Sequence, residues 1–321
     1  MKKNEKGAIK MNAVRIHKYG GADELIYEDA PMPTVEANDV LIQVVASSVN
    51  PVDWKIREGH LKEMISYSMP VILGLDVSGI VESVGKSVTK FKVGDAVFSR
   101  PDVKRNGTYA EFVAVREDEI AFKPKTISHV ESASLPLAGI TAWEAIFTTA
   151  KLSANQKVLI HGGSGGVGSL AIQLAKSRGA YVISTTSTKN LALVKSLGAD
   201  EVIDYKNQQF EKIVKAVDVV FDTIGGEVQE LSWSVLKQDG ILVSIVAQPS
   251  EEIAAKHKVR SAFIFIGPNA EILTQIAELV DAGKVRPIIG AEFELADIAK
   301  AHALSESGRS VGKIVLYVGQ P

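Results

Sequence analysis

The stretch HGGSGGVG, His161–Gly168, joins a short apolar run to a segment whose apolar residues recur at helical spacing. Three of its glycines, Gly163, Gly165 and Gly168, fit the pattern G-x-G-x-x-G. A bare match to this pattern is weak evidence, but here it stands between a predicted strand and a predicted helix. The stretch therefore predicts the first β-turn-α unit of a dinucleotide-binding fold.

Each glycine has an expected task in such a turn. We expect Gly163 to permit the tight turn, Gly165 to let a pyrophosphate approach the backbone, and Gly168 to allow close packing of helix on strand. The helix N-terminus adds free N–H groups and a positive dipole end. A glycine-rich loop without a ligand is the less favoured alternative. The predicted cofactor contacts in this loop are Gly163, Ser164, Gly165, Gly166, Val167 and Gly168.

The end of the second predicted strand bears on the choice of dinucleotide. An NAD site normally has Asp or Glu there, to bind the ribose 2′-hydroxyl. This chain has Ser184–Lys189, with hydroxyl groups and one cation, which suit a 2′-phosphate. NADPH is therefore the expected cofactor, with Thr186, Ser187 and Lys189 as contacts. The alternative for Lys189 is a solvated lysine in the first turn of the next helix.

From about residue 132, short apolar runs alternate with helix-length segments, as in a parallel sheet covered on both faces. The clearest helix is predicted at Val167–Lys176. The pattern predicts a doubly wound α/β domain of six strands. The candidate strands are Val158–Ile160, Tyr181–Ser184, Glu201–Ile203, Val217–Phe221, Gly240–Val246 and Ala262–Ile266.

The first part of the chain has a different pattern of apolar and polar residues. From Met11 to about Lys125, short alternating segments are punctuated by Gly and Pro, which predicts a strand-rich, partly closed sheet. We expect the C-terminal residues to return to this domain, although a small third unit is an open alternative. The expected division is 11–131 with 285–321 for the β-rich domain and 132–284 for the nucleotide-binding domain, with 1–10 as a flexible extension.

Composition limits the other possibilities. The chain has 36 basic and 38 acidic residues without a long block of one sign, so nucleic acid is not an expected partner. It has no cysteine, which excludes disulfides, thiolate nucleophiles and cysteine-ligated zinc. The basic N-terminus is not followed by the apolar core of a signal peptide, and no apolar run is long enough to span a membrane. We expect a cytoplasmic protein.

Several segments carry a resemblance to a known family. Gly162–Lys176, Gly198–Tyr205, Ser48–Lys55, Gly74–Gly79 and Gly308–Leu316 resemble the quinone oxidoreductase branch of the medium-chain dehydrogenase/reductases. This branch includes zeta-crystallin and related alkenal and enone reductases. The resemblance covers nearly the whole chain. It implies a GroES-like catalytic domain formed by both chain ends, a Rossmann domain between them, and a homodimer.

The resemblance also bears on metal binding. Zinc-dependent members carry a cysteine in the segment matching Asn50–Asp53, and Gly-His-Glu where this chain has Gly74-Leu75-Asp76. Both ligands are missing here. We therefore expect no metal, and expect hydrogen bonds to polarise a substrate carbonyl instead.

The candidate catalytic residues lie within the segment Ser48–Lys55. Asn50 matches a family asparagine beside the nicotinamide ribose, and its amide can donate and accept at once. Asn50-Pro51 merely forming a turn is the alternative. Asp53 and Lys55 follow closely, and Lys55 is the candidate electrophile or proton source, with an exposed structural lysine as its alternative. Tyr67 is a further candidate proton donor.

Further cofactor contacts come from the resemblance and from sheet geometry. Tyr205 matches a family tyrosine near the adenosine phosphate. Asp222 ends the fourth strand, at the sheet edge where such folds bind ligands. Arg309 and Lys313 lie in a C-terminal segment that in the family folds back toward the site, and either can contact phosphate or ribose.

These observations predict an NADPH-dependent oxidoreductase that transfers hydride to a quinone or to an α,β-unsaturated carbonyl without zinc. Small molecules are the expected substrates. An enoyl-thioester reductase is the enzymatic alternative. A non-catalytic NADPH-binding sensor or structural protein is the alternative from another class, since a cofactor fingerprint establishes binding and does not establish turnover.

Overall fold

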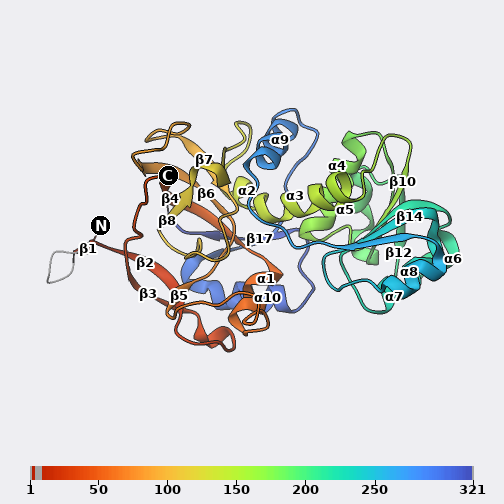
Figure 1. Ribbon diagram of the computed structural model, residues 1–321, viewed down its shortest axis with the longest axis horizontal. Helices are drawn as coiled ribbons and strands as arrows, with labels where there is room; N and C mark the ends of the chain where they lie inside the picture. The colour runs from red at the N-terminus through yellow and green to blue at the C-terminus, as the bar shows by residue number, and fades with distance from the viewer. Residues whose placement is uncertain (1, 4–8, 320–321) are drawn as a thin grey trace. The chain divides into compact units, whose positions relative to one another are not determined.

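The computed structural model describes residues 2–3 and 9–319, which form two compact units (Figure 1). Unit 1 comprises the residues up to Leu137, Gly267–Asp281 and the residues from Pro287 on. Unit 2 comprises Ala138–Ile266 and Ala282–Arg286. The expected division differs mainly at helix α9 (Ala270–Asp281), which packs its apolar face against strand β9 (Ile120–Phe122) of unit 1.

Unit 2 is built on a six-stranded parallel sheet in the order β12-β11-β10-β13-β14-β15. All six predicted strands are present, with bounds that differ by a few residues, so the predicted α/β class is confirmed. The strands are β10 (Lys157–Ile160), β11 (Tyr181–Thr186), β12 (Glu201–Asp204), β13 (Val217–Asp222), β14 (Leu236–Ser244) and β15 (Arg260–Phe263).

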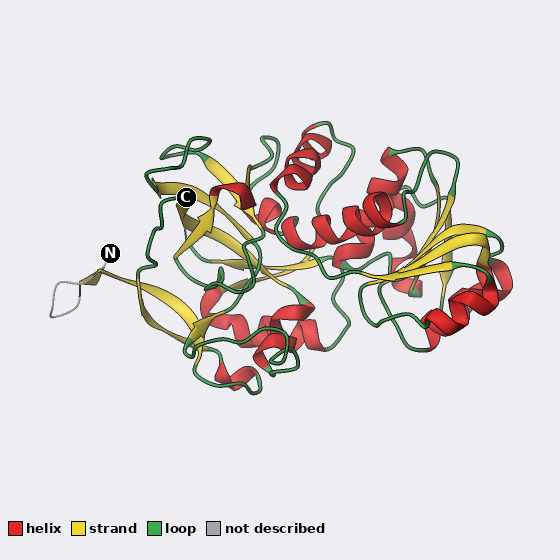
Figure 2. Cartoon of the chain, in the orientation of Figure 1, coloured by secondary structure: helices red, strands yellow, loops and turns green. Residues whose placement is uncertain are grey.

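Helices alternate with these strands in the chain (Figure 2). The predicted helix at Val167–Lys176 is α4 (Gly166–Ser177), whose buried face packs against β10 and β11. The other helices are α3 (Pro136–Trp143), α5 (Leu191–Ser196), α6 (Phe210–Ile213), α7 (Glu227–Ser232) and α8 (Glu251–His257).

The strand order identifies the part of the sheet edge at which a ligand is expected to bind. After β10 the chain moves outward through β11 and β12, then returns to pair β13 with the other side of β10. In open parallel sheets, ligands bind outside the carboxyl ends of the strands at such a reversal point. The glycine stretch after β10 and the residues after β13 therefore lie beside each other, and Thr223 Oγ1 donates to the His161 carbonyl across 2.8 Å.

Unit 1 is β-rich. One sheet runs β16-β17-β4-β6-β7-β9, with β8 also paired to β4, and a second joins β2 to β1, β3 and β5. The strands are β1 (Lys2–Lys3), β2 (Ile9–Ile16), β3 (Ile26–Pro31), β4 (Asp39–Val49), β5 (Val71–Ile72), β6 (Val77–Val84), β7 (Ala96–Ser99), β8 (Phe112–Arg116), β16 (Ile289–Glu294) and β17 (Lys313–Tyr317). Helices α1 (Pro51–Arg57), α2 (His129–Ala133) and α10 (Ile298–Glu306) accompany them.

The two chain ends meet in this unit. Strand β17 pairs antiparallel with β4, and its register sets Ile314 opposite Val49. This pairing brings Lys313 beside the residues that follow β4. We expected residues 1–10 to form a flexible extension. Residues 1 and 4–8 of this extension lie outside the described residues. Within the described part, Lys2–Lys3 pair with Ile9–Lys10 as two antiparallel strands.

None of the helices formed by residues 2–3 and 9–319 is both long enough and apolar enough to cross a membrane.

Candidate active site and cofactor site

The polar site of unit 1 begins at Asn50, where β4 ends and α1 starts. Pro51 occupies the first helical position, where its missing N–H costs nothing. The Asn50 backbone N–H donates to Asp53 Oδ2 across 2.8 Å, so Asp53 caps the helix start. Asn50-Pro51 therefore forms the start of a helix, and not merely the turn that we weighed as an alternative. The Asn50 side chain, however, hydrogen-bonds elsewhere.

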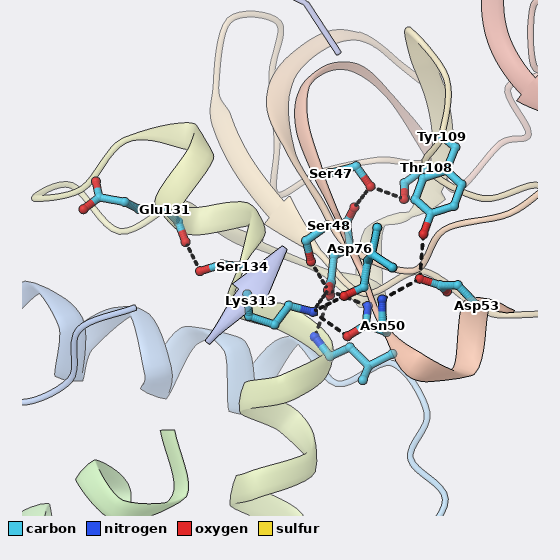
Figure 3. Close-up of polar contacts among 12 residues, drawn as sticks. Ser47, Ser48, Asn50, Asp53, Asp76, Thr108, Tyr109, Glu131, Ser134 and Lys313 are labelled. Carbon is cyan, nitrogen blue, oxygen red and sulfur yellow. Dashed lines mark hydrogen bonds and ion pairs between the residues drawn. The ribbon is translucent and has the colours of Figure 1, made fainter. Parts of the chain in front are cut away.

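The amide of Asn50 lies between two buried charges (Figure 3). Its Nδ2 donates to Asp76 Oδ2 across 2.8 Å, and its Oδ1 accepts from Lys313 Nζ across 2.5 Å. Lys313 Nζ also pairs with Asp76 Oδ2 at 3.1 Å and donates to the Val49 carbonyl at 3.1 Å. Ser48 Oγ donates to the same Asp76 oxygen across 2.6 Å. We name Asn50, Asp76 and Lys313 the polar triad.

Asp53 lies at one end of a second chain of buried side chains. Tyr109 donates to Asp53 Oδ2 across 2.7 Å, and His302 Nε2 lies 3.4 Å from the Tyr109 oxygen. Arg57 Nη1 lies 3.1 Å from His302 Nδ1, and a guanidinium can only donate. His302 therefore accepts at Nδ1 and carries its proton at Nε2. The donors run in one direction, from Arg57 through His302 and Tyr109 to Asp53.

Burial controls the protonation of this chain. It raises the pKa of Asp53 to about 7, against the lowering effect of the hydrogen bonds from Tyr109 and Asn50. Within the described residues, the other oxygen of Asp53, Oδ1, is buried without a hydrogen-bond partner. Burial also lowers the pKa of His302 to about 3, so this imidazole is neutral. Asp53 is thus a carboxyl group poised to change charge near neutral pH.

The remaining unit 1 candidates lie outside the polar triad. Lys55 is half-buried on α1, with its ammonium 5.6 Å from the centroid of the Trp54 ring. Tyr67 donates to the Val103 carbonyl across 2.6 Å, and burial raises its pKa. Arg309 is exposed. Their predicted roles in catalysis or cofactor binding stay predictions.

The glycine stretch of unit 2 combines close packing with an open outer face. A Cβ at Gly168 would lie 2.3 Å from the Gly162 carbonyl oxygen, which agrees with the expected close packing of α4 on its strand. A Cβ at Gly163 would lie 2.1 Å from Ser184 Oγ of β11. The left-handed backbone falls on Gly162, at φ 67°, one residue before Gly163, for which we expected the tight turn. Gly163 is required by its approach to β11.

Gly165 differs from these positions. A Cβ there would meet a single atom within contact range, the Gly162 carbonyl oxygen at 3.3 Å. The neighbouring residues Ser164, Gly166 and Val167 are half-exposed at the start of α4. The side chain that is missing at Gly165 thus leaves the helix N-terminus accessible, as the diphosphate of a dinucleotide requires.

Hydroxyl and amide groups connect this loop to the end of β11. Ser164 Oγ accepts from Thr186 Oγ1 at 3.0 Å and from Asn190 Nδ2 at 3.1 Å, and Asn190 also contacts Ser187 Oγ at 3.2 Å. We name Ser164, Thr186, Ser187 and Asn190 the hydroxyl cluster. Lys189 is exposed beside it. Sequence reasoning missed Asn190, although it falls in the same short segment as Lys189.

Two further candidates lie at the carboxyl edge of the sheet. Asp222 is buried, and its carboxylate accepts from the backbone of Ile224 and Gly225 and from Gln229 and Ser244 at 2.8 to 3.0 Å. Its side chain therefore shapes the turn after β13, and its predicted contact with the cofactor stays a prediction. Tyr205 is 53% exposed after β12, with the Lys206 ammonium 5.2 Å from its ring centroid, and its predicted contact with the cofactor stays a prediction.

His161, the first residue of the glycine stretch, lies 3.1 Å from Thr185 Oγ1 and 3.0 Å from Ser232 Oγ through its two ring nitrogens. Burial lowers its pKa to about 4, so it is neutral and structural at physiological pH. Throughout residues 2–3 and 9–319, no group of three or more His, Asp or Glu side chains is arranged to hold a metal ion.

Comparison with known proteins connects the two sites to one family. A family model described as an alcohol dehydrogenase GroES-like domain matches residues 36–125, and one described as a zinc-binding dehydrogenase matches 197–316. The zebrafish (Danio rerio) mitochondrial NAD(P)H oxidoreductase RTN4IP1 is 35% identical, with 96% of this chain and 91% of the relative covered. This chain belongs to the medium-chain dehydrogenase/reductase superfamily, in its quinone oxidoreductase branch.

Other members of the branch agree with this assignment. The chloroplastic NADPH-dependent alkenal/one oxidoreductase of Arabidopsis thaliana is 37% identical, with 93% of this chain and 77% of the relative covered. The structure of the quinone oxidoreductase from Coxiella burnetii superposes with a TM-score of 0.90 at 36% identity, covering 97% of this chain and all of that one. The predicted GroES-like and Rossmann folds of this branch are thereby confirmed.

Within the branch fold, the residues that sequence reasoning missed are those with long-range partners. Asp76 was noted only as a missing metal ligand, yet it accepts hydrogen bonds from Ser48, Asn50, Lys313 and the Leu137 backbone N–H. Tyr109 and His302 were not singled out. Neither stands out in the sequence, because Tyr109 follows the polar stretch Asn106-Gly107-Thr108 and the helix of His302 also carries Lys300.

Proposed function

We propose that this chain is an NADPH-dependent oxidoreductase that reduces quinones or α,β-unsaturated carbonyl compounds without zinc. The observation that carries the cofactor assignment is the hydroxyl cluster, which places neutral donors and the nearby Lys189 where an NAD site would have a carboxylate. The names of the relatives from Arabidopsis and Coxiella support the acceptor class.

The binding roles follow from the geometry of each unit. The open face at Gly165 and the N-terminus of α4 would hold the diphosphate, and Lys189 with the hydroxyl cluster would hold the 2′-phosphate. Asn50 would contact the nicotinamide ribose through the donor and acceptor that remain on its amide. When bound, NADPH supplies the hydride. The protein supplies position and electrostatic stabilisation.

Zinc independence is supported by the polar triad. Asn50 and Asp76 stand in the two segments where zinc-dependent members carry ligands, and the Lys313 ammonium already contacts both side chains. A divalent cation at that point would meet a buried positive charge. Stoichiometric zinc in the purified protein, measured by elemental analysis, would contradict the zinc-independent assignment.

The decisive test is oxidation of NADPH, followed by loss of the reduced-nicotinamide absorbance, against a panel of acceptors. The panel holds 1,4-benzoquinone, 9,10-phenanthrenequinone, a short 2-alkenal and crotonyl-coenzyme A, and NADH is the paired control. We expect turnover with the quinones or the alkenal and a preference for NADPH. Turnover confined to the thioester would favour an enoyl-thioester reductase, and tight NADPH binding without turnover would favour a sensor.

A cytoplasmic location and a homodimeric state stay predictions.

A further inference from the structure

Lys313 is a buried lysine whose hydrogen-bonding capacity is fully used inside the protein. Its side chain is 7% exposed, and an ammonium has three donors. The three acceptors are the Val49 carbonyl, Asn50 Oδ1 and Asp76 Oδ2. With three partners for three donors, Lys313 has none left to offer a substrate or a phosphate. Its effect on a reaction must therefore pass through the residues that it touches.

Of these residues, Asn50 has unused capacity. A carboxamide carries two N–H donors and an oxygen with two lone pairs. One donor is used by Asp76 and one lone pair by Lys313, which leaves one donor and one acceptor for a ligand. Asp76 Oδ2, in contrast, already accepts from Ser48, Asn50 and Lys313. A ligand at this site would thus be recognised by Asn50.

The two charges also decide which way the amide points. An isolated carboxamide turns about its terminal torsion at little cost, because that torsion is broad. Here a flip would set the NH2 group against the Lys313 ammonium and the oxygen against the Asp76 carboxylate. Both contacts would be repulsive in a buried environment, where charges interact strongly. The ion pair therefore fixes the amide in one orientation.

We propose that Lys313, with Asp76 as its counter-ion, is a positioning residue that presents the Asn50 amide in one orientation to the cofactor. The inference rests on the proposed function, because it concerns the contact between Asn50 and NADPH. Lys313 acts through Asn50 and not by donating a proton or a hydrogen bond to the substrate. Preorganisation of this kind lowers the cost of ordering a polar contact when the ligand binds.

The test compares Lys313→Met with the double variant Lys313→Met/Asp76→Asn. The single variant leaves the buried Asp76 carboxylate without its counter-ion and is expected to lose stability. The double variant removes both charges together, so it separates folding from positioning. We expect it to fold and yet to bind NADPH roughly tenfold more weakly, since the two charges that fix the orientation of the amide are gone. Binding and turnover within about twofold of the original protein would overturn the proposal.

A double-mutant cycle with Asn50→Ala tests whether the effect of Lys313 on NADPH binding passes through Asn50. If Lys313 acts through Asn50, removing the charge pair in the Asn50→Ala background should change NADPH affinity by less than about twofold. A full tenfold loss in that background would show an independent role and overturn the proposal. Lys300→Met is the matched control, because Lys300 is an exposed lysine of the same unit, paired with Asp297 at 2.7 Å. It should leave binding and turnover unchanged.

A measurement without cofactor keeps this inference separate from the proposed function. The side-chain amide protons of Asn50, assigned by their loss in Asn50→Ala, should exchange slowly with solvent in the original protein. They should exchange markedly faster in the double variant. Equal exchange in both proteins would overturn the positioning role even if NADPH binds. Failure of the original protein to bind NADPH, with the exchange difference present, would instead refute the proposed function alone.

Discussion

The phenol of Tyr109 donates a hydrogen bond to Asp53 Oδ2 across 2.7 Å, and both side chains are buried. The carboxyl group also accepts from the Asn50 backbone N–H. These two donors stabilise the carboxylate form, whereas burial favours the neutral acid. The pKa of about 7 is the balance of the two effects.

The first prediction concerns this balance. Tyr109→Phe removes the donor and leaves the ring in place, so the pKa of Asp53 should rise further above its value of about 7. The pKa of Asp53 can be measured by infrared spectroscopy of the carboxyl stretch as a function of pH. The variant Asp53→Asn assigns the band. Tyr317→Phe is the control, since that tyrosine is partly exposed and bonded to Glu292. A pKa for Asp53 that stays constant or falls in Tyr109→Phe would refute the assigned hydrogen bond.

The second prediction concerns stability and pH. The folded pKa of Asp53 lies above the unfolded value of roughly 3.9, so the folded state binds this proton more tightly. Its contribution is therefore favourable below the unfolded pKa and is lost as pH rises from about 4 to about 7. Above that window the cost is on the order of 4 kcal/mol. In Asp53→Asn, the free energy of unfolding from urea titrations should fall less between about pH 4 and pH 7. An unchanged dependence on pH in this variant would contradict the prediction.

The third prediction tests the cofactor phosphate. Lys189→Ala should weaken NADPH binding by about 10- to 100-fold, because a charge-assisted hydrogen bond to phosphate is lost. NADH affinity should stay the same, since NADH lacks that phosphate. Fluorescence titration measures both. Lys212→Ala removes another exposed lysine of the same unit and should change neither affinity. Unaltered NADPH affinity in Lys189→Ala would remove Lys189 from the site.

The fourth prediction separates two glycines of one motif. Gly165→Ala should fold normally, because its backbone is extended at φ −80° and the new Cβ would meet one atom at 3.3 Å. It should nevertheless bind NADPH more weakly, since the methyl group enters the face open to the diphosphate. Gly168→Ala should unfold more easily, because its Cβ would lie 2.3 Å from a backbone oxygen. Thermal unfolding and NADPH titration of both variants distinguish packing from binding. The opposite pattern would reverse the two assignments.

Much of unit 2 could be predicted because its signals are local in the chain. The glycine stretch, the six apolar runs and the helix after the first strand are each defined by the spacing of neighbouring residues. The left-handed backbone lies at Gly162, one residue before Gly163, where we expected the tight turn, and Gly163 instead approaches β11 closely. Spacing along the chain carries no information about that approach.

The residues alone allowed us to predict the class of each unit and the glycine-rich turn after β10, and the lack of cysteine excludes cysteine-ligated zinc. The use of the polar residues of unit 1 depends on contacts between segments that are far apart in the chain. Lys313 reaches Asn50 because β17 pairs with β4 in one register, and Arg57 reaches His302 because α1 packs against α10. These partners are separated by 263 and 245 residues. Their contact, and the burial that raises the pKa of Asp53, exist only once the strands and helices have packed.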